Sequence, residues 1–154
     1  MMSIEVKVAL VEERPMLRSH LEEYLSELRK YGDVGIDYPY FDAYWQDESR
    51  WPYSIRESGQ LVGFAFVNGV SLSGKKTDFS LGEFYIVPKA RGRGIGRDAA
   101  DIILSAHRGV WELRVMRLNT PAQKFWPSAI EATQAREIER IDNDGDTIYR
   151  FRIG

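Results

Sequence analysis

Seven residues near the middle of the chain, RGRGIGR at 91–97, combine three glycines with three arginines. They follow the apolar run LGEFYIVP and precede a run with helical spacing. Glycines let the backbone approach a ligand without Cβ obstruction, and a helix start offers unpaired N–H groups with a partial positive charge. This glycine loop, residues 91–97, is therefore predicted to bind phosphate.

The glycine spacing separates the known kinds of phosphate loop. A dinucleotide-binding loop needs G-x-G-x-x-G in the first βα unit, and counting from Gly92 gives Arg97 where the third glycine belongs. A Walker loop, G-x-x-x-x-G-K-S/T, meets Arg97 at the same place. Both kinds of nucleotide loop are thus disfavoured.

The elements that must position this loop follow from periodicity. Apolar spacings of three and four indicate amphipathic helices, and alternating apolar residues indicate strands. The segment 36–53 has no clean period and is expected to be a loop with a short helix. The buried face of the central helix is predicted to contain Ile95, Ala99, Ile102, Ile103 and Ala106. Strands are expected at 4–11, 53–57, 61–68, 81–87, 110–118 and 149–153, and helices at 15–30, at 95–106 and from 121 onward.

The start of the last helix carries its own signal. Thr120 can cap a helix that begins at Pro121, with Gln123 completing a capping box. Asn119 would then stay free just ahead of the cap.

Composition bounds the remaining choices. A chain of 154 residues with 44% hydrophobic and 29% charged residues fits a single globular domain, 1–154. The net charge of -2 argues against a general nucleic-acid or membrane binder. The absence of cysteine excludes disulfides, thiolate metal sites and a cysteine nucleophile, and no metal site is expected. A signal peptide and a long apolar run are also lacking, so a cytoplasmic location is expected.

Two motifs together resemble a known family. The pattern R-x-x-G-x-G is filled by Arg91, Gly94 and Gly96 after a strand, and NTPAQKFW at 119–126 supplies an asparagine, an alanine and an aromatic pair. This combination resembles the GNAT superfamily of N-acetyltransferases. The resemblance implies an α+β fold, with a mixed, mostly antiparallel sheet of about six or seven strands, flanking helices and splayed central strands.

The resemblance also implies a cofactor site for acetyl-CoA. Its pyrophosphate would lie on the loop amides, and its pantetheine arm would pair with backbone groups at Ile86 and Val87. The Val87 amide would polarise the thioester carbonyl, Asn119 would contact the pantetheine, and Phe125 or Trp126 would pack near the cofactor. The loop amides would come from Arg91, Gly92, Arg93, Gly94, Ile95, Gly96 and Arg97.

Catalysis in this family needs a neutral amine, whereas an alkyl amine with a pKa of about 10.4 is protonated at neutral pH. Glu83 is the candidate base, because it lies mid-strand near the expected thioester and on the same face as Tyr85. A structural pair between Glu83 and an arginine is the competing interpretation. Trp126 stands where many members have an acidic tyrosine, so Tyr85 or Tyr149 would have to substitute, or the thiolate would leave without help.

The acceptor is predicted only as a class. Acidic and aromatic residues in the segment 31–53 would attract a cationic amine, or would form an ordinary solvated loop. We therefore expect acetyl transfer to a primary amine of a small molecule, peptide or protein, with a homodimer allowed. The alternative is a GNAT-like module that binds CoA as a sensor or interaction domain.

Overall fold

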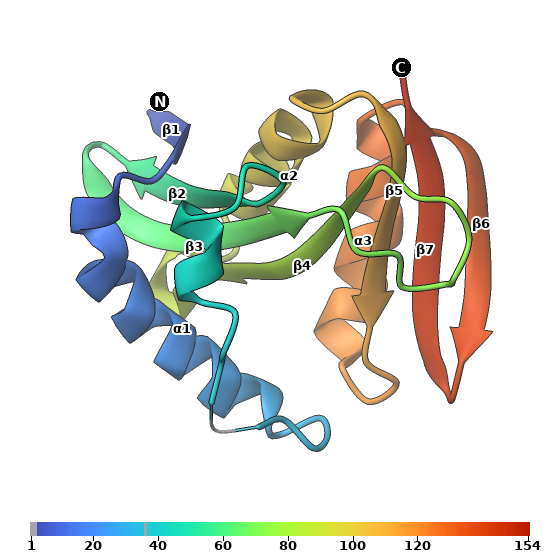
Figure 1. Cartoon of the computed structure of the whole chain (residues 1–154), viewed down its shortest axis with the longest axis horizontal. Coiled ribbons are helices and arrows are strands. Elements are labelled where there is room, and N and C mark those ends of the chain that lie inside the picture. The colour runs from blue at the N-terminus through green and yellow to red at the C-terminus, as the bar shows by residue number, and fades with distance from the viewer. Residues whose placement is uncertain (1–2, 36) are drawn as a thin grey trace.

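The computed structural model describes residues 3–35 and 37–154. Within them lies one seven-stranded sheet of order β1-β2-β3-β4-β5-β7-β6, antiparallel at every pairing except β4 with β5. This confirms the predicted mixed sheet (Figure 1). The strands are β1 Ile4–Val8, β2 Trp51–Glu57, β3 Gln60–Asn68, β4 Phe79–Ile86, β5 Gly109–Val115, β6 Arg136–Asn143 and β7 Asp146–Ile153.

Within residues 3–35 and 37–154, three α-helices cover the sheet. They are α1 Arg14–Leu28, α2 Ile95–Ser105 and α3 Thr120–Ala132, with a short 3₁₀ helix at Asp42–Trp45. On α1, Tyr24 packs edge-on against Phe64 of β3, with ring centroids 5.7 Å apart. Tyr53 of the adjacent strand faces the other way and bonds His107 just after α2. Side chains alternate between the faces of a sheet, so α1 and α2 cover opposite faces (Figure 1).

The central strands separate along their length. β4 and β5 pair only at Phe79–Leu81 with Trp111–Leu113, although β4 continues to Ile86. Beyond that point the strands diverge, and α3 lies behind the gap between them (Figure 1). The predicted splay is therefore present, and it leaves one edge of β4 without a neighbouring strand between residues 82 and 86.

One glycine fixes β4 against β3. A Cβ at Gly63 would lie 2.1 Å from the Tyr85 carbonyl oxygen, so any larger residue would push the strands apart. Gly63 pairs with Ile86, which lies at the end of the splayed segment. The small residue thus sets the position of the cleft-side end of β4.

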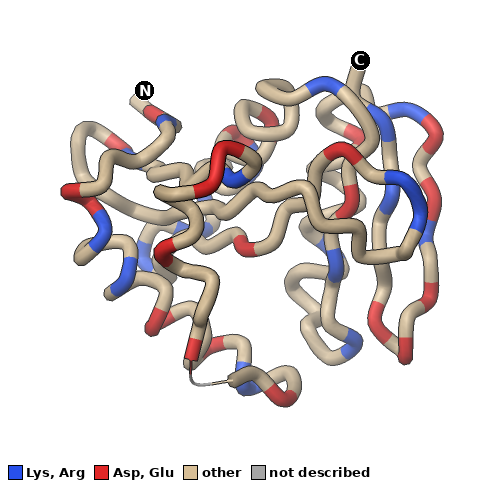
Figure 2. Tube along the Cα trace, viewed as in Figure 1, with Lys and Arg blue, Asp and Glu red and all other residues tan. Residues whose placement is uncertain are grey.

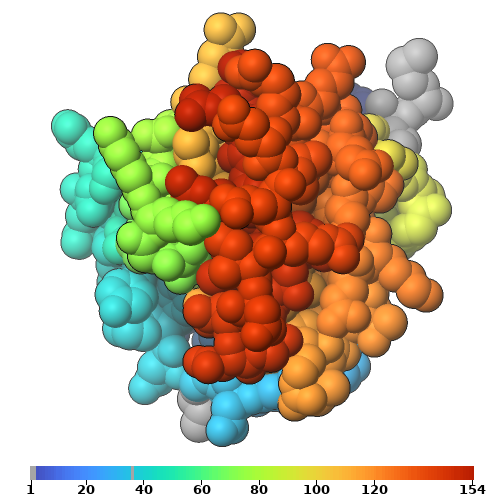
Figure 3. All heavy atoms as spheres, turned by 90° about the vertical axis from the view of Figure 1, so that its right-hand side faces the viewer, coloured from blue at the N-terminus to red at the C-terminus, as the bar shows by residue number. Residues whose placement is uncertain are grey.

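The loop between β3 and β4 is tied to the opposite half of the sheet. Glu112 of β5 is fully buried, accepts hydrogen bonds from the Leu72 and Ser73 amides, and pairs with Arg150 at 2.7 Å. These donors hold the pKa of Glu112 below its ordinary value despite the opposing effect of burial. Lys75 reaches Glu139 of β6, and Figure 3 shows this loop lying against the last hairpin.

Most predicted elements are confirmed, and two details are wrong. On α2 the buried face contains Ala100 and Leu104, whereas Ile102 is 42% exposed and Ala106 is also exposed. The observed buried face is therefore offset around the helix from the predicted one, because Ala100 and Leu104 satisfy the spacing of three and four as well as Ile102 and Ala106 do. The cap of α3 is also different: the Asn119 side chain accepts from the Ala122 amide at 3.2 Å, so Asn119 rather than Thr120 is the N-cap.

Candidate functional site

A cleft of about 580 Å³ opens where β4 and β5 diverge. This volume lies within the range of small-molecule and cofactor sites. Its walls come from three separate stretches of the chain: α1, the end of β4 with the glycine loop that follows it, and α3. The residues that line it are Tyr24, Glu27, Leu28, Phe84, Tyr85, Ile86, Arg91, Gly92, Gly94, Gly96, Arg97, Asn119, Pro121, Ala122, Lys124, Phe125, Trp126, Ser128 and Ala129.

The glycine loop has the backbone of an anion cradle. Gly92 and Gly94 have φ of +83° and +87°, a left-handed conformation that favours glycine. Gly94 is the N-cap of α2 and carries no side chain to satisfy the helix start. The Asp98 amide donates to the Gly94 carbonyl at 3.0 Å, so the amides of residues 95–97 precede the first helical hydrogen bond. This backbone can present several N–H groups to a phosphate.

The three arginines of the loop have different surroundings. Arg93 is held by Glu57 through two hydrogen bonds of 2.7 and 2.9 Å and does not line the cleft. Arg97 and Lys124 both line it and bring positive charge to this end. Arg91 lines it as well, but its own amide donates to the Pro88 carbonyl at 3.2 Å. The predicted contribution of the Arg91 amide is therefore wrong, and its side chain faces the cleft instead.

The exposed edge of β4 offers different amides from those predicted. The Val87 amide donates to the Val62 carbonyl of β3 at 2.8 Å. Backbone groups alternate along an antiparallel strand, so the N–H groups of Phe84 and Ile86 point to the side away from β3, into the gap. The predicted role of the Val87 amide is thus wrong, because this strand is one residue out of phase with the expectation.

Aromatic side chains form the α3 wall of the cleft. Phe84 packs on Phe125 and Trp126, with ring centroids 6.0 and 5.1 Å apart. A Cβ at Gly96 would lie 3.4 Å from Phe125, so glycine allows the loop to approach α3 closely. Asn119 lines the same wall while capping the helix. The predicted residues of α3 are therefore gathered at the cleft.

The predicted base, Glu83, meets two tyrosines instead of an arginine. Tyr24 donates to its Oε1 at 2.9 Å and Tyr38 donates to its Oε2 at 2.7 Å. Burial raises the pKa of Glu83 above its ordinary value of 4.5, and the two hydrogen bonds oppose this effect. Burial, reinforced by the Glu83 charge, also raises the pKa values of Tyr24 and Tyr38, so both remain neutral donors. These three residues are called the tyrosine–glutamate cluster below.

Tyr85 lies beside this cluster on the same face of β4. Its hydroxyl donates to Glu23 at 3.3 Å, and the Arg91 guanidinium lies 5.6 Å from its ring centre. Burial, with the Glu23 and Glu27 carboxylates, raises the pKa of Tyr85 to about 12. Tyr149, the other predicted substitute, is buried under Arg140 and does not line the cleft.

Several cleft residues were missed by sequence reasoning. Lys124 and Ser128 lie four residues apart on α3, next to the recognised aromatic pair, so helical spacing could have found them. Tyr24 and Leu28 follow the apolar spacing of three and four that predicts the helix at 15–30, and this periodicity gives no sign that the stripe continues into a cleft. Tyr38 had no signal beyond its place in an acidic and aromatic segment, whose acidic residues Figure 2 shows as separate red positions along the tube.

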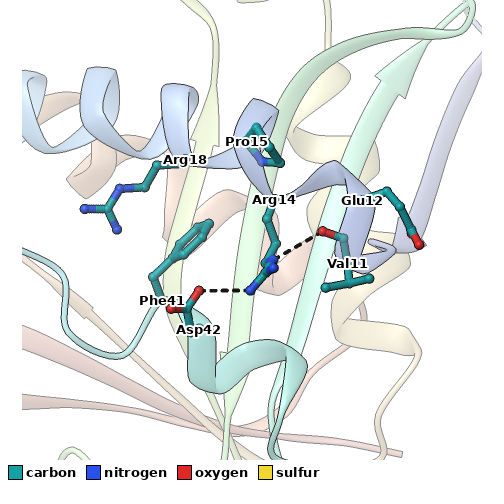
Figure 4. A pocket seen from close by; sticks show the side chains of 7 residues that line it. All are labelled: Val11, Glu12, Arg14, Pro15, Arg18, Phe41 and Asp42. Carbon is teal, nitrogen blue, oxygen red and sulfur yellow. Dashed lines mark hydrogen bonds and ion pairs between the residues drawn. The ribbon is translucent and has the colours of Figure 1, made fainter.

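A second hollow lies at the start of α1 (Figure 4). Its volume is about 530 Å³, but Arg14 is bound there to Asp42 and to the Val11 carbonyl, both at 3.3 Å. Arg18 lies over the Phe41 ring at 5.2 Å. Since a helix rises about 1.5 Å per residue, this hollow is about 20 Å along α1 from Leu28 and the cleft. It shares no residue with the candidate site.

Comparison with known proteins gives the family. The model of the acetyltransferase (GNAT) family matches residues 15–128, which include the glycine loop, Glu83 and the aromatic pair. The chain therefore belongs to the GNAT acetyltransferase family. A comparison with curated protein sequences found no significant match.

Solved structures agree with this fold. An acetyltransferase from Thermus thermophilus is 13% identical with a TM-score of 0.72, covering 97% of this chain and 95% of its own. A GNAT-family acetyltransferase from Streptococcus agalactiae is 16% identical with a TM-score of 0.71, covering 98% and 96%. PaiA N-acetyltransferase from Thermoplasma acidophilum, solved in complex with coenzyme A, is 15% identical with a TM-score of 0.63, covering 97% and 99%. At these identities the likeness concerns the fold.

The described residues contain neither a membrane-spanning helix nor a metal-binding cluster. None of the helices there is both long and apolar enough to cross a membrane. Within residues 3–35 and 37–154, no group of three or more histidine, aspartate or glutamate side chains could hold a metal ion.

Proposed function

We propose that this chain is an acetyl-CoA-dependent N-acetyltransferase that moves the acetyl group to a primary amine by direct attack. The observation that carries the proposal is the cleft between β4 and β5, which is open to the part of β4 that has no neighbouring strand and to an uncapped helix start. Family membership supports acetyl transfer, and the part-buried Glu83 carboxylate beside the cleft supports an amine acceptor.

The cofactor would use three parts of the cleft. Loop amides at Gly92 to Arg97 would bind the pyrophosphate, with Arg97 and Lys124 adding positive charge. The pantetheine would lie along β4, against Phe125 and Trp126. The Ile86 amide, rather than that of Val87, would polarise the thioester carbonyl, because it points into the gap.

Glu83 would accept the proton that the attacking amine loses. The amine nitrogen forms a bond to the acetyl carbon, the bond from that carbon to sulfur breaks, and the amine proton passes to the Glu83 carboxylate. Burial raises the pKa of Glu83, which makes its carboxylate a better proton acceptor than an exposed one.

Binding and turnover test this proposal separately. Acetyl-CoA, but not ATP or NAD, should raise the melting temperature, since a ligand at 100 times its Kd stabilises the fold by about 2.7 kcal/mol. Release of free thiol should then depend on a primary amine from a panel and should fall strongly in Glu83→Gln. Binding with no thiol release across the panel would favour a CoA-binding sensor, and no response to acetyl-CoA would overturn both functions.

A further inference from the structure

The described part of the fold contains one feature that the acetyl-transfer proposal leaves unused. Tyr24 of α1 lines the cofactor cleft and at the same time donates its hydroxyl proton to Glu83 at 2.9 Å. Tyr38 bonds the other Glu83 oxygen but does not line the cleft. The two tyrosines therefore bind one carboxylate from different sides, and only Tyr24 connects it to the cofactor side.

The Tyr24 hydroxyl lies close to the main chain of β4. Burial raises the pKa of Tyr24, and the nearby backbone amide of Phe84 opposes this effect to a smaller extent. The Phe84 amide points away from β3 and into the gap, because the Val87 amide points toward β3 and the direction alternates along the strand. The hydroxyl therefore lies at the splayed edge of β4, where the thioester would pair with the strand.

We propose that Tyr24 is the catalytic proton donor to the departing thiolate and that Glu83 returns the proton to it. This rests on the proposed function. Trp126, on α3, has no acidic proton to give, and the Tyr85 hydroxyl points to Glu23 rather than to the base. Tyr24 alone among these side chains joins the cleft to Glu83 through a hydrogen bond.

The proton transfers balance as a closed cycle. The neutral amine attacks the acetyl carbon, and the proton it loses goes to the Glu83 carboxylate while the carbon–sulfur bond breaks. Tyr24 gives its hydroxyl proton to the sulfur and takes the proton that Glu83 gained. The products are the amide and the free thiol of CoA, and Glu83 ends as a carboxylate with Tyr24 neutral.

The matched pair Tyr24→Phe and Tyr38→Phe tests the relay, because each removes one hydroxyl bonded to Glu83 and keeps the ring. With acetyl-CoA as donor we expect Tyr24→Phe to lower kcat about 100-fold, in the range of general acid catalysis, and to leave KM for acetyl-CoA within about twofold. Tyr38→Phe should lower kcat much less, since it disturbs only the position of the base.

The leaving group supplies a readout that a structural role would not change. An acetyl thioester of p-nitrothiophenol releases a stable thiolate that needs no proton. With this donor the kcat of Tyr24→Phe should therefore approach the kcat of Tyr38→Phe. If the ratio of the two variants' kcat values is the same with acetyl-CoA as with the aryl thioester, the relay is overturned and the acetyltransferase proposal still stands. Wild-type protein that releases no thiol with any amine would overturn both.

Should Tyr24→Phe fail to fold, wild-type protein decides the matter. Across a series of aryl thioesters, a shallow dependence of kcat on the pKa of the thiol supports protonation during bond breaking. A steep dependence, as for an unassisted thiolate, contradicts it.

Discussion

The two ends of the cleft are built from different parts of the chain. The proposed phosphate end comes from consecutive residues, 92–97, and would act through main-chain N–H groups at the start of α2. The proposed acid–base end joins Glu83 to Tyr24 and Tyr38, which are 59 and 45 residues away in sequence, and would act through side chains. The phosphate end should therefore depend on backbone shape, and the acid–base end on individual functional groups.

Substitution of the base should have the largest effect and should separate the two ends. We expect Glu83→Gln to lower kcat by about 100-fold to 10,000-fold, the range typical of general base catalysis, because the amide cannot accept the proton. Its Kd for acetyl-CoA, measured by calorimetry, should match that of wild type. The exposed Glu5→Gln on β1 is the control, and a parallel loss of cofactor affinity in Glu83→Gln would show that the two ends are not independent.

Disturbing the loop backbone should have the opposite pattern. Gly96→Val adds side-chain atoms where even a Cβ would lie 3.4 Å from Phe125, so we expect acetyl-CoA to bind about 100-fold more weakly, about 2.7 kcal/mol. The melting temperature without ligand should change little by comparison. Asp101→Val, at an exposed position of the same helix, controls for the helix propensity of valine. Equal Kd values for the two variants would contradict the close approach of the ligand to this loop.

The pH dependence should report the acid–base end alone. Because the pKa of Glu83 is raised above 4.5, its carboxylate becomes protonated at a higher pH than an ordinary glutamate as the pH falls. Below this raised pKa, the rate should decrease tenfold for each pH unit. An acceptor with a weakly basic amine keeps its own ionisation out of this range. This decrease in rate at acidic pH should be absent from Glu83→Gln. If the decrease persists in that variant, it comes from the titration of another group.

The arginines of the loop give the smallest expected difference. Arg97→Ala should weaken acetyl-CoA binding about tenfold, since a hydrogen bond to a charged group contributes about 1.5 kcal/mol. Arg93→Ala should change the Kd less than twofold, because that side chain is held by Glu57 outside the cleft. The two variants make the same chemical change four residues apart. Similar losses in both would mean that net charge, and not the lining of the cleft, governs binding.

The contrast between the two ends also explains what could be predicted. The glycine loop, the strand before it and the helix after it are local patterns, and the structure has them at the predicted places. The direction of the β4 amides is a matter of register with β3, which the sequence of β4 does not contain. The role of Val87 was therefore predicted one residue out of phase. The cap of α3 was misplaced for a more local reason, since Asn119 and Thr120 are both good caps.

Residue order and periodicity by themselves predicted the mixture of strands and helices and the glycine-lined helix start, because backbone conformation depends on neighbouring residues. The resemblance of two local motifs indicated the family. Only the tertiary structure decided that Glu83 is held by two tyrosines, that Tyr24 faces both the base and the cleft, and that Arg93 turns away. These contacts join segments that are brought together when α1 packs on β3 and when β4 parts from β5. No local pattern encodes a distance between such segments.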